Sequence, residues 1–113
     1  MILITGGAYQ GKLEFAKSLV SDREGEEPDI LYHMEQYIGR LVEDGEDVEE
    51  KLHEMMREHP DPIIICDEVG SGVIPIDEKE VTYREAVGRT MCYLANMADE
   101  VYRVYCGIGE RIK

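Results

Sequence analysis

Short apolar runs alternate along this chain with longer segments in which apolar residues recur every three or four positions. Short continuous apolar runs are typical of strands covered by helices on both faces, and the longer spacing is typical of amphipathic helices. The predicted strands are 2–5, 30–32, 63–66 and 101–105. The predicted helices are 11–20, 34–42, 48–59 and 78–98. Prolines at positions 60 and 62 end the third helix, and the apolar stripe of the fourth helix is expected to lie in the core.

This alternation of strands and helices predicts a three-layer α/β sandwich with a mainly parallel sheet. Gly107-Ile108-Gly109 permits a tight reversal after the last strand, so residues 111–113 are expected to return as an antiparallel edge hairpin. The 113 residues, of which 43% are hydrophobic, fit one domain that spans 1–113.

A glycine-rich segment joins the first predicted strand to the first predicted helix. It contains Gly6, four further residues, Gly11 and Lys12, which is the spacing of a phosphate-binding loop in its required strand-to-helix context. Glycines let the backbone N–H groups curl around an anion, and the helix N-terminus adds a positive dipole. The predicted nucleotide-binding residues are Gly6, Gly7, Ala8, Tyr9, Gln10, Gly11, Lys12 and Leu13. The alternative is a glycine turn that carries a surface lysine.

Lys12 is the predicted catalytic cation of this loop, since it would reach the terminal phosphates of ATP or GTP. Leu13 stands where the loop normally has a serine or threonine hydroxyl that holds Mg²⁺. The sequence therefore predicts a P-loop NTPase-like sandwich in which phosphate binding is better supported than catalysis.

Two carboxylates, Asp67 and Glu68, follow the predicted strand 63–66. Ligands of open α/β sheets gather beyond the carboxyl ends of strands, so this pair is expected at the same edge as the glycine loop. Both are candidate catalytic residues, and Asp67 is the candidate metal ligand, because a carboxylate can hold a magnesium-bound water or accept a proton during phosphoryl transfer. The alternative is a solvated turn before Gly70.

The formal net charge of −13 argues against nucleic acid and anionic membrane surfaces as partners. Cys66, Cys92 and Cys106 lack metal-ligand spacing and lie on apolar segments, so we expect buried, reduced thiols and a cytoplasmic location. Neither a signal peptide nor an apolar span of about 20 residues is recognisable.

The two ends of the chain resemble the adenosylcobinamide kinase / adenosylcobinamide-phosphate guanylyltransferase family. The resemblance is carried by ILITGGAYQGK, by DEVGSGVIP, by ADEVYRVYCGIGERIK, and by Arg84, Gly88 and Arg89 between the last two. It implies a kinase that acts on a corrinoid, and it makes Gly70 and Gly72 candidates for a substrate loop. Turn geometry alone is the alternative for these two glycines.

The chain also departs from that family, whose members are longer. Their middle segment carries the histidine that becomes guanylylated, and this chain lacks that segment. His33, His53 and His59 stand in no matching context and are read as solvated side chains, so guanylyl transfer is not expected. Met91 stands where the family commonly has asparagine.

Two function classes follow. The first is a shortened kinase that moves the terminal phosphate of ATP or GTP to adenosylcobinamide or a related hydroxylated acceptor, with Mg²⁺ as a candidate cofactor. The second is a non-catalytic relative that binds a nucleotide or a partner. Members of that family form trimers, so the resemblance implies a possible homo-oligomer. Tyr37, Met55 and Met56 are candidates either for its interface or for the core of the domain.

Overall fold

The computed structural model describes residues 1–69 and 77–113. Within these residues the strands form one sheet in the order β2-β3-β1-β4-β5. The strands are β1 (Ile2–Gly6), β2 (Ile30–Leu31), β3 (Ile63–Asp67), β4 (Glu100–Tyr105) and β5 (Ile108–Arg111). The β2–β3, β3–β1 and β1–β4 pairs are parallel, and β4 and β5 are antiparallel. The predicted mainly parallel sheet with an antiparallel edge pair is confirmed.

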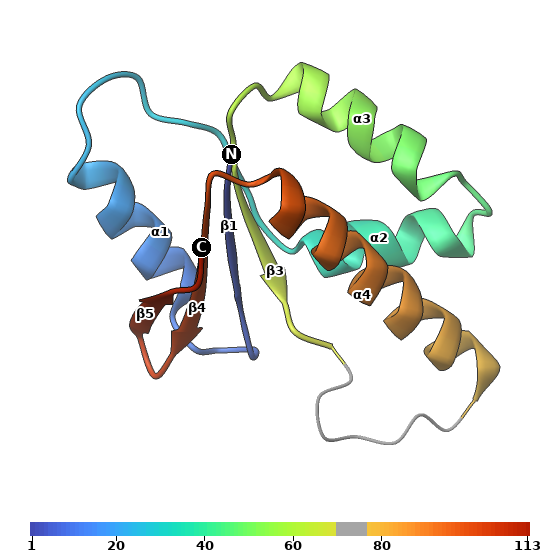
Figure 1. Ribbon diagram of the computed structural model, residues 1–113. Helices are drawn as coiled ribbons and strands as arrows, with labels where there is room; N and C mark the ends of the chain where they lie inside the picture. Colours follow the sequence, from blue (N-terminus) through green and yellow to red (C-terminus); the bar gives the residue numbers. More distant parts are fainter. Residues whose placement is uncertain (70–76) are drawn as a thin grey trace.

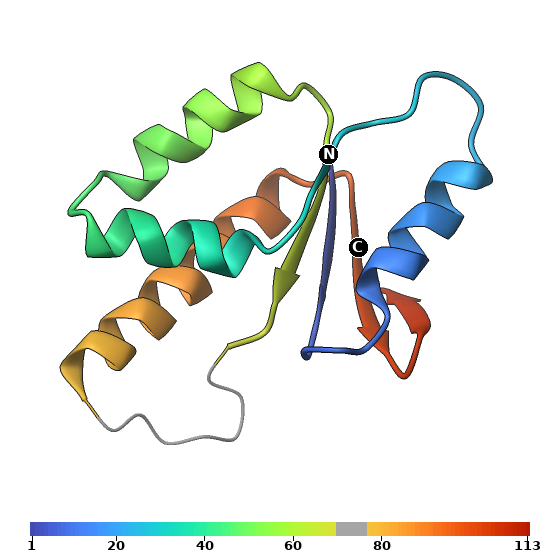
Figure 2. The same ribbon diagram turned by 180° about the vertical axis from the view of Figure 1, so that it is seen from behind.

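Helices cover both faces of this sheet. They are α1 (Lys12–Ser21), α2 (Met34–Glu43), α3 (Val48–Glu58) and α4 (Glu78–Met97). Figure 1 shows α1 on one side of the strands and α2, α3 and α4 on the other, and the reverse view in Figure 2 shows the same division. This arrangement is the three-layer α/β sandwich that the sequence predicts.

The strands bury alternate side chains against the two helical layers, as the two-residue period of a strand requires. Ile2 and Ile4 of β1 belong to the apolar cluster that packs against α1, whereas Leu3 belongs to the cluster beneath α2, α3 and α4. The central strands are therefore apolar on both faces, which explains their continuous apolar runs. The predicted stripe of α4 is core, since Val87 and Leu94 are buried.

The helix boundaries lie close to the predicted ones, and side-chain caps set the starts of α3 and α4. The side chain of Asp47 accepts a hydrogen bond from the backbone N–H of Glu50 at the start of α3, and Asp77 does the same for Glu80 at the start of α4. Such caps satisfy N–H groups that have no partner within the helix.

Two expectations are corrected. The reversal expected at 107–109 lies at Cys106 and Gly107, and Ile108 and Gly109 already belong to β5. The φ angles of Cys106 and Gly107 are 52° and 77°. Positive φ at both central residues is typical of a two-residue hairpin turn, so the chain reverses within these two residues. Of the three cysteines expected to be buried, only Cys66 is buried, and Cys92 and Cys106 are exposed on the outer side of α4 and in this turn.

None of the helices in the described part of the chain is long and apolar enough to span a membrane.

Candidate functional site

The loop of residues 7–11, hereafter the glycine loop, connects the end of β1 to the start of α1. Gly11 precedes the helix with φ 88°, in the left-handed region, and a Cβ at this position would lie 3.2 Å from Cα of Gly107. Gly11 offers no side chain to cap the helix, and within the described residues the backbone N–H groups of Lys12 and Leu13 donate no hydrogen bond. The helix therefore presents unpaired donors and its positive dipole end to the loop.

Lys12 lies beneath the glycine loop, and its side chain is only 3% exposed. Its Nζ donates to the carbonyl oxygen of Gly7 at 2.6 Å and lies 2.7 Å from Oδ1 of Asp67. The predicted loop lysine and the predicted strand-end carboxylate are thus in direct contact. An ammonium group held this way is available to an anion that replaces one of these oxygen partners.

A pocket of about 640 Å³ opens between the glycine loop and the start of α2. Its lining residues are Ala8, Tyr9, Gln10, Gly11, Lys12, Leu13, Glu14, Tyr32, His33, Gln36 and Asp67. Six of the eight predicted nucleotide-binding residues are in this set. The side chain of Leu13 also packs against the apolar cluster beneath α1, so it supplies no metal ligand where the loop motif expects a hydroxyl.

The C-terminal hairpin fixes the shape of the glycine loop through Gln10. The backbone N–H of Cys106 donates to Oε1 of Gln10 at 2.7 Å, and the N–H of Gly107 donates to the carbonyl oxygen of Gln10 at 2.8 Å. Gln10 is therefore a positioning residue, a role that its place in the loop motif did not reveal. Tyr9 projects from the loop tip fully exposed, with φ 60°.

The predicted acidic pair separates at the end of β3. Asp67 faces Lys12, whereas Oε1 of Glu68 accepts a hydrogen bond from Nε of Arg103 on β4 at 3.0 Å. Glu68 does not line the pocket that Asp67 lines. Gly70 and Gly72 lie outside the described residues.

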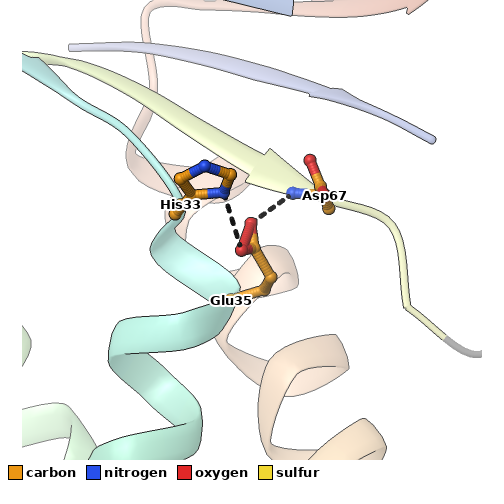
Figure 3. Close-up of side chains that lie close together, drawn as sticks. All are labelled: His33, Glu35 and Asp67. Carbon is orange, nitrogen blue, oxygen red and sulfur yellow. Dashed lines mark hydrogen bonds and ion pairs between the residues drawn. The ribbon is translucent and has the colours of Figure 1, made fainter. Parts of the chain in front are cut away.

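Glu35, in the first turn of α2, is a member of the site that the sequence did not single out. It is 5% exposed, and its Oε1 accepts a hydrogen bond from the backbone N–H of Asp67 at 2.9 Å. Figure 3 shows His33, at the start of α2, with its ring beside the same carboxylate. Nδ1 of His33 lies 3.5 Å from Oε2 of Glu35. Its place next to the buried Met34 and three residues before the buried Ile38 is a weak sequence signal, because a charged residue at such a position of a helix is usually exposed.

The other two histidines lie on the surface, as expected. His53 of α3 is hydrogen-bonded to the hydroxyl of Tyr93, and Nδ1 of His59 lies 2.8 Å from Oδ2 of Asp29. Neither lines the pocket beside the glycine loop.

The site is electronegative on its β3 side. Burial, and then the nearby carboxylates of Glu35 and Asp67, raise the pKa of the Cys66 thiol to about 12. The pKa of Tyr83 is also raised, first by burial and then by Glu35. Among the described residues that line the pocket, Lys12 is the one lysine, and it contacts Asp67, which in turn lies beside Glu35.

The fold and site define an α/β protein with an uncapped helix N-terminus and a buried lysine behind a glycine loop. The family described as cobinamide kinase / cobinamide phosphate guanyltransferase matches residues 30–112, and the chain belongs to this family. This match begins after the glycine loop, so the phosphate-binding interpretation of residues 6–13 depends on the loop's own sequence and geometry.

A curated relative is the bifunctional adenosylcobalamin biosynthesis protein CobU of Salmonella typhimurium. It is 39% identical to this chain over 51 residues, which are 45% of this chain and 28% of the relative. The matched part of this chain thus spans less than a third of that relative's length.

Proposed function

We propose that this chain binds the triphosphate of ATP or GTP at the glycine loop and transfers the terminal phosphate to adenosylcobinamide or a related small hydroxylated acceptor. Family membership supports the reaction class, and the name of the Salmonella relative supports a place in corrinoid metabolism. The observation that carries the proposal is Lys12, held beneath an uncapped helix N-terminus at the pocket that the loop residues line.

Each site residue has a role in this proposal. The loop N–H groups and the start of α1 bind the phosphates, and Lys12 exchanges Gly7 and Asp67 for phosphate oxygens and stabilises the charge that develops on the transferred group. Asp67 is the preferred candidate to orient or deprotonate the acceptor hydroxyl, since it faces the pocket. Glu68 is less suited, because its carboxylate is paired with Arg103.

Mg²⁺ does not fit the usual position in this loop. The hydroxyl that would hold it is replaced by Leu13, whose side chain packs on the apolar cluster beneath α1. We therefore assign no step to a loop-bound Mg²⁺. Guanylyl transfer is also left out. His53 and His59 do not line the pocket, and His33, which does, stands in no sequence context that matches the guanylylated histidine of the family.

A non-catalytic relative that binds nucleotide or a partner is the second candidate function. Leu13 favours it, because losing a metal ligand costs rate more than affinity. Incubation of the protein with ATP or GTP, Mg²⁺ and adenosylcobinamide separates the two candidates. Phosphorylated adenosylcobinamide supports the kinase, whereas nucleotide binding without product supports the second function.

The binding step is tested by Lys12→Ala. Removal of the ammonium should abolish or greatly weaken triphosphate binding in calorimetry, because a charge-assisted contact to the phosphates is lost. Lys17→Ala is the matched control, since Lys17 is exposed on the same helix and should leave the affinity unchanged. Equal affinity of wild type and Lys12→Ala would remove the glycine loop from the proposed function.

The remaining parts of the proposal are a cytoplasmic location and assembly of copies of the chain into a homo-oligomer. Tyr37, Met55 and Met56 are partly buried against the chain's own core, which limits what they offer to an interface.

A further inference from the structure

We propose that His33, Glu35 and Asp67 form a binding site for a first-row divalent cation such as Mn²⁺ or Zn²⁺. The ligand atoms of the three residues lie within 4.8 Å of one another, which is the spacing that one ion can bridge. They come from two elements: His33 and Glu35 from the start of α2, and Asp67 from the end of β3 (Figure 3).

Glu35 is the main argument for a cation. A carboxylate that is 5% exposed is costly unless its charge is paired or coordinated. Backbone N–H groups of Asp67 and Gln36 donate to it, and in the described part of the chain His33 is the one basic side chain within 4.0 Å. No lysine or arginine of these residues neutralises it.

His33 is the second, independent observation. Its Nδ1 is shielded from water and makes no hydrogen bond to any described residue. The residue is held with φ 58°, in the left-handed region that non-glycine residues rarely adopt, and its ring packs on Tyr32 in a tilted arrangement with centroids 3.8 Å apart. A strained backbone thus holds a nitrogen that makes no hydrogen bond to any described residue 3.5 Å from a buried carboxylate.

The donor set indicates the kind of ion. One imidazole nitrogen with two carboxylate oxygens suits Mn²⁺ or Zn²⁺ better than Mg²⁺, which prefers oxygen ligands and retains its waters. Three protein ligands leave positions open, and the adjacent pocket can supply oxygen atoms of a ligand to them. This part of the inference rests on the proposed function: the oxygen atoms from the pocket are then those of the bound phosphates. The ion at His33, Glu35 and Asp67 takes the place of the Mg²⁺ that a loop hydroxyl would have held.

Lys12 competes with the cation, because its Nζ lies 2.7 Å from Oδ1 of Asp67. A divalent ion at this carboxylate is repelled by the ammonium, so the ion should bind more tightly once Lys12 is removed. Metal binding and triphosphate binding therefore respond in opposite directions to Lys12→Ala.

The test measures free Mn²⁺ by electron paramagnetic resonance while it is titrated with the protein in the absence of nucleotide. Wild type should bind one equivalent. Glu35→Gln keeps the acceptor for the Asp67 N–H but loses the charge, and it should weaken binding at least about tenfold. His33→Asn should do the same, and asparagine tolerates the left-handed backbone of that position. Circular dichroism checks that both variants fold.

Two control variants separate ligation from net charge. Glu14→Gln removes a carboxylate at the rim of the same pocket, and His59→Asn removes a surface imidazole, and neither should change Mn²⁺ binding. Failure of wild type to bind Mn²⁺, or equal binding by wild type and by either ligand variant, would overturn the site.

Lys12→Ala supplies the last comparison. Tighter Mn²⁺ binding by this variant supports Asp67 as a ligand, and unchanged binding would overturn that assignment. Because nucleotide is absent, the outcome is independent of the calorimetric test above. Mn²⁺ binding without triphosphate binding would remove the proposed function and leave the cation site.

Discussion

The choice between the two candidate functions, a kinase and a non-catalytic relative, depends most on the side chain of Leu13. Leu13 follows the buried Lys12 in the loop that is proposed to bind phosphates, yet it contributes packing to the cluster beneath α1 where a hydroxyl would contribute a metal ligand. A single residue thus determines whether the first turn of α1 helps to hold a metal or only completes the core.

We expect Leu13→Ser to raise phosphoryl transfer to adenosylcobinamide at least about tenfold and to make it dependent on Mg²⁺, because the hydroxyl supplies a ligand for the ion that neutralises developing charge. The measurement is product formation at matched nucleotide and acceptor concentrations.

Leu13→Ala is the matched control, since it makes the same loss of apolar packing without adding a hydroxyl. Equal activity of the serine and alanine variants would show that the missing hydroxyl does not limit the reaction.

The residues of the site differ in how far the sequence could predict them. Lys12 and Asp67 were predicted because each belongs to a local pattern, a loop motif and the end of an apolar strand. Glu35 was missed, because its burial depends on how α2 crosses the end of β3, and no local pattern encodes that packing. His33 was read as a solvated histidine, and the structure places it at 42% side-chain exposure with its Nδ1 turned toward Glu35.

At the scale of elements, the hydrophobic pattern was sufficient to predict the strands, the helices and the layers. Outside the final hairpin the boundaries differed by at most one residue, and the final turn was placed too late. A turn of Cys106 and Gly107 depends on two left-handed backbone positions, and cysteine is not a residue that signals one of them. Gly109, expected in the turn, instead serves close packing of β5 against α1.

Gly109→Ala should lower the free energy of unfolding by about 1–2 kcal/mol, since the new methyl group would occupy space that the Phe15 ring fills. The ring has little freedom to move, because it packs on Tyr102 with centroids 5.2 Å apart. Urea unfolding followed by circular dichroism measures the change.

Gly88→Ala is the matched control for that substitution. A Cβ at Gly88 meets no atom within 4 Å, so alanine should stabilise α4 by about 0.5–1 kcal/mol through helix propensity. Destabilisation of both variants to the same extent would contradict the packing explanation.

On the scale of the whole molecule, the net charge of −13 means that carboxylates repel one another, so ion pairs with the few lysines and arginines help to hold distant segments together. Glu100 joins its own strand, β4, to the segment after α1 and to β5. It accepts a hydrogen bond from the Tyr102 hydroxyl at 2.7 Å and is paired with Arg23 after α1 at 2.8 Å and with Arg111 of β5 at 3.7 Å.

These contacts give Glu100 a stabilising role that depends on pH. The Tyr102 hydroxyl and then Arg23 hold the pKa of Glu100 below its usual value of 4.5. Since the folded pKa is lowered, the contribution is complete above about pH 4.5 and is lost as the pH falls through the folded value. We expect Glu100→Gln to be about 1 kcal/mol less stable than wild type at pH 7, and the gap to be smaller at pH 3, below the usual pKa of the carboxyl group.

Urea unfolding of both proteins at pH 7 and pH 3 measures the gap. Glu85→Gln serves as the control, because Glu85 is exposed on α4 and should show no such gap. A gap that is as large at pH 3 as at pH 7 would contradict the ionic explanation.

The two hydrogen bonds between Gln10 and the turn at Cys106 and Gly107 also have a consequence for synthesis on the ribosome. The glycine loop leaves the exit tunnel before the groups that brace it, which emerge roughly a hundred residues later. A nascent chain therefore cannot hold the loop in its final shape until translation has passed residue 107, so the shape on which the proposed phosphate binding depends forms late in synthesis.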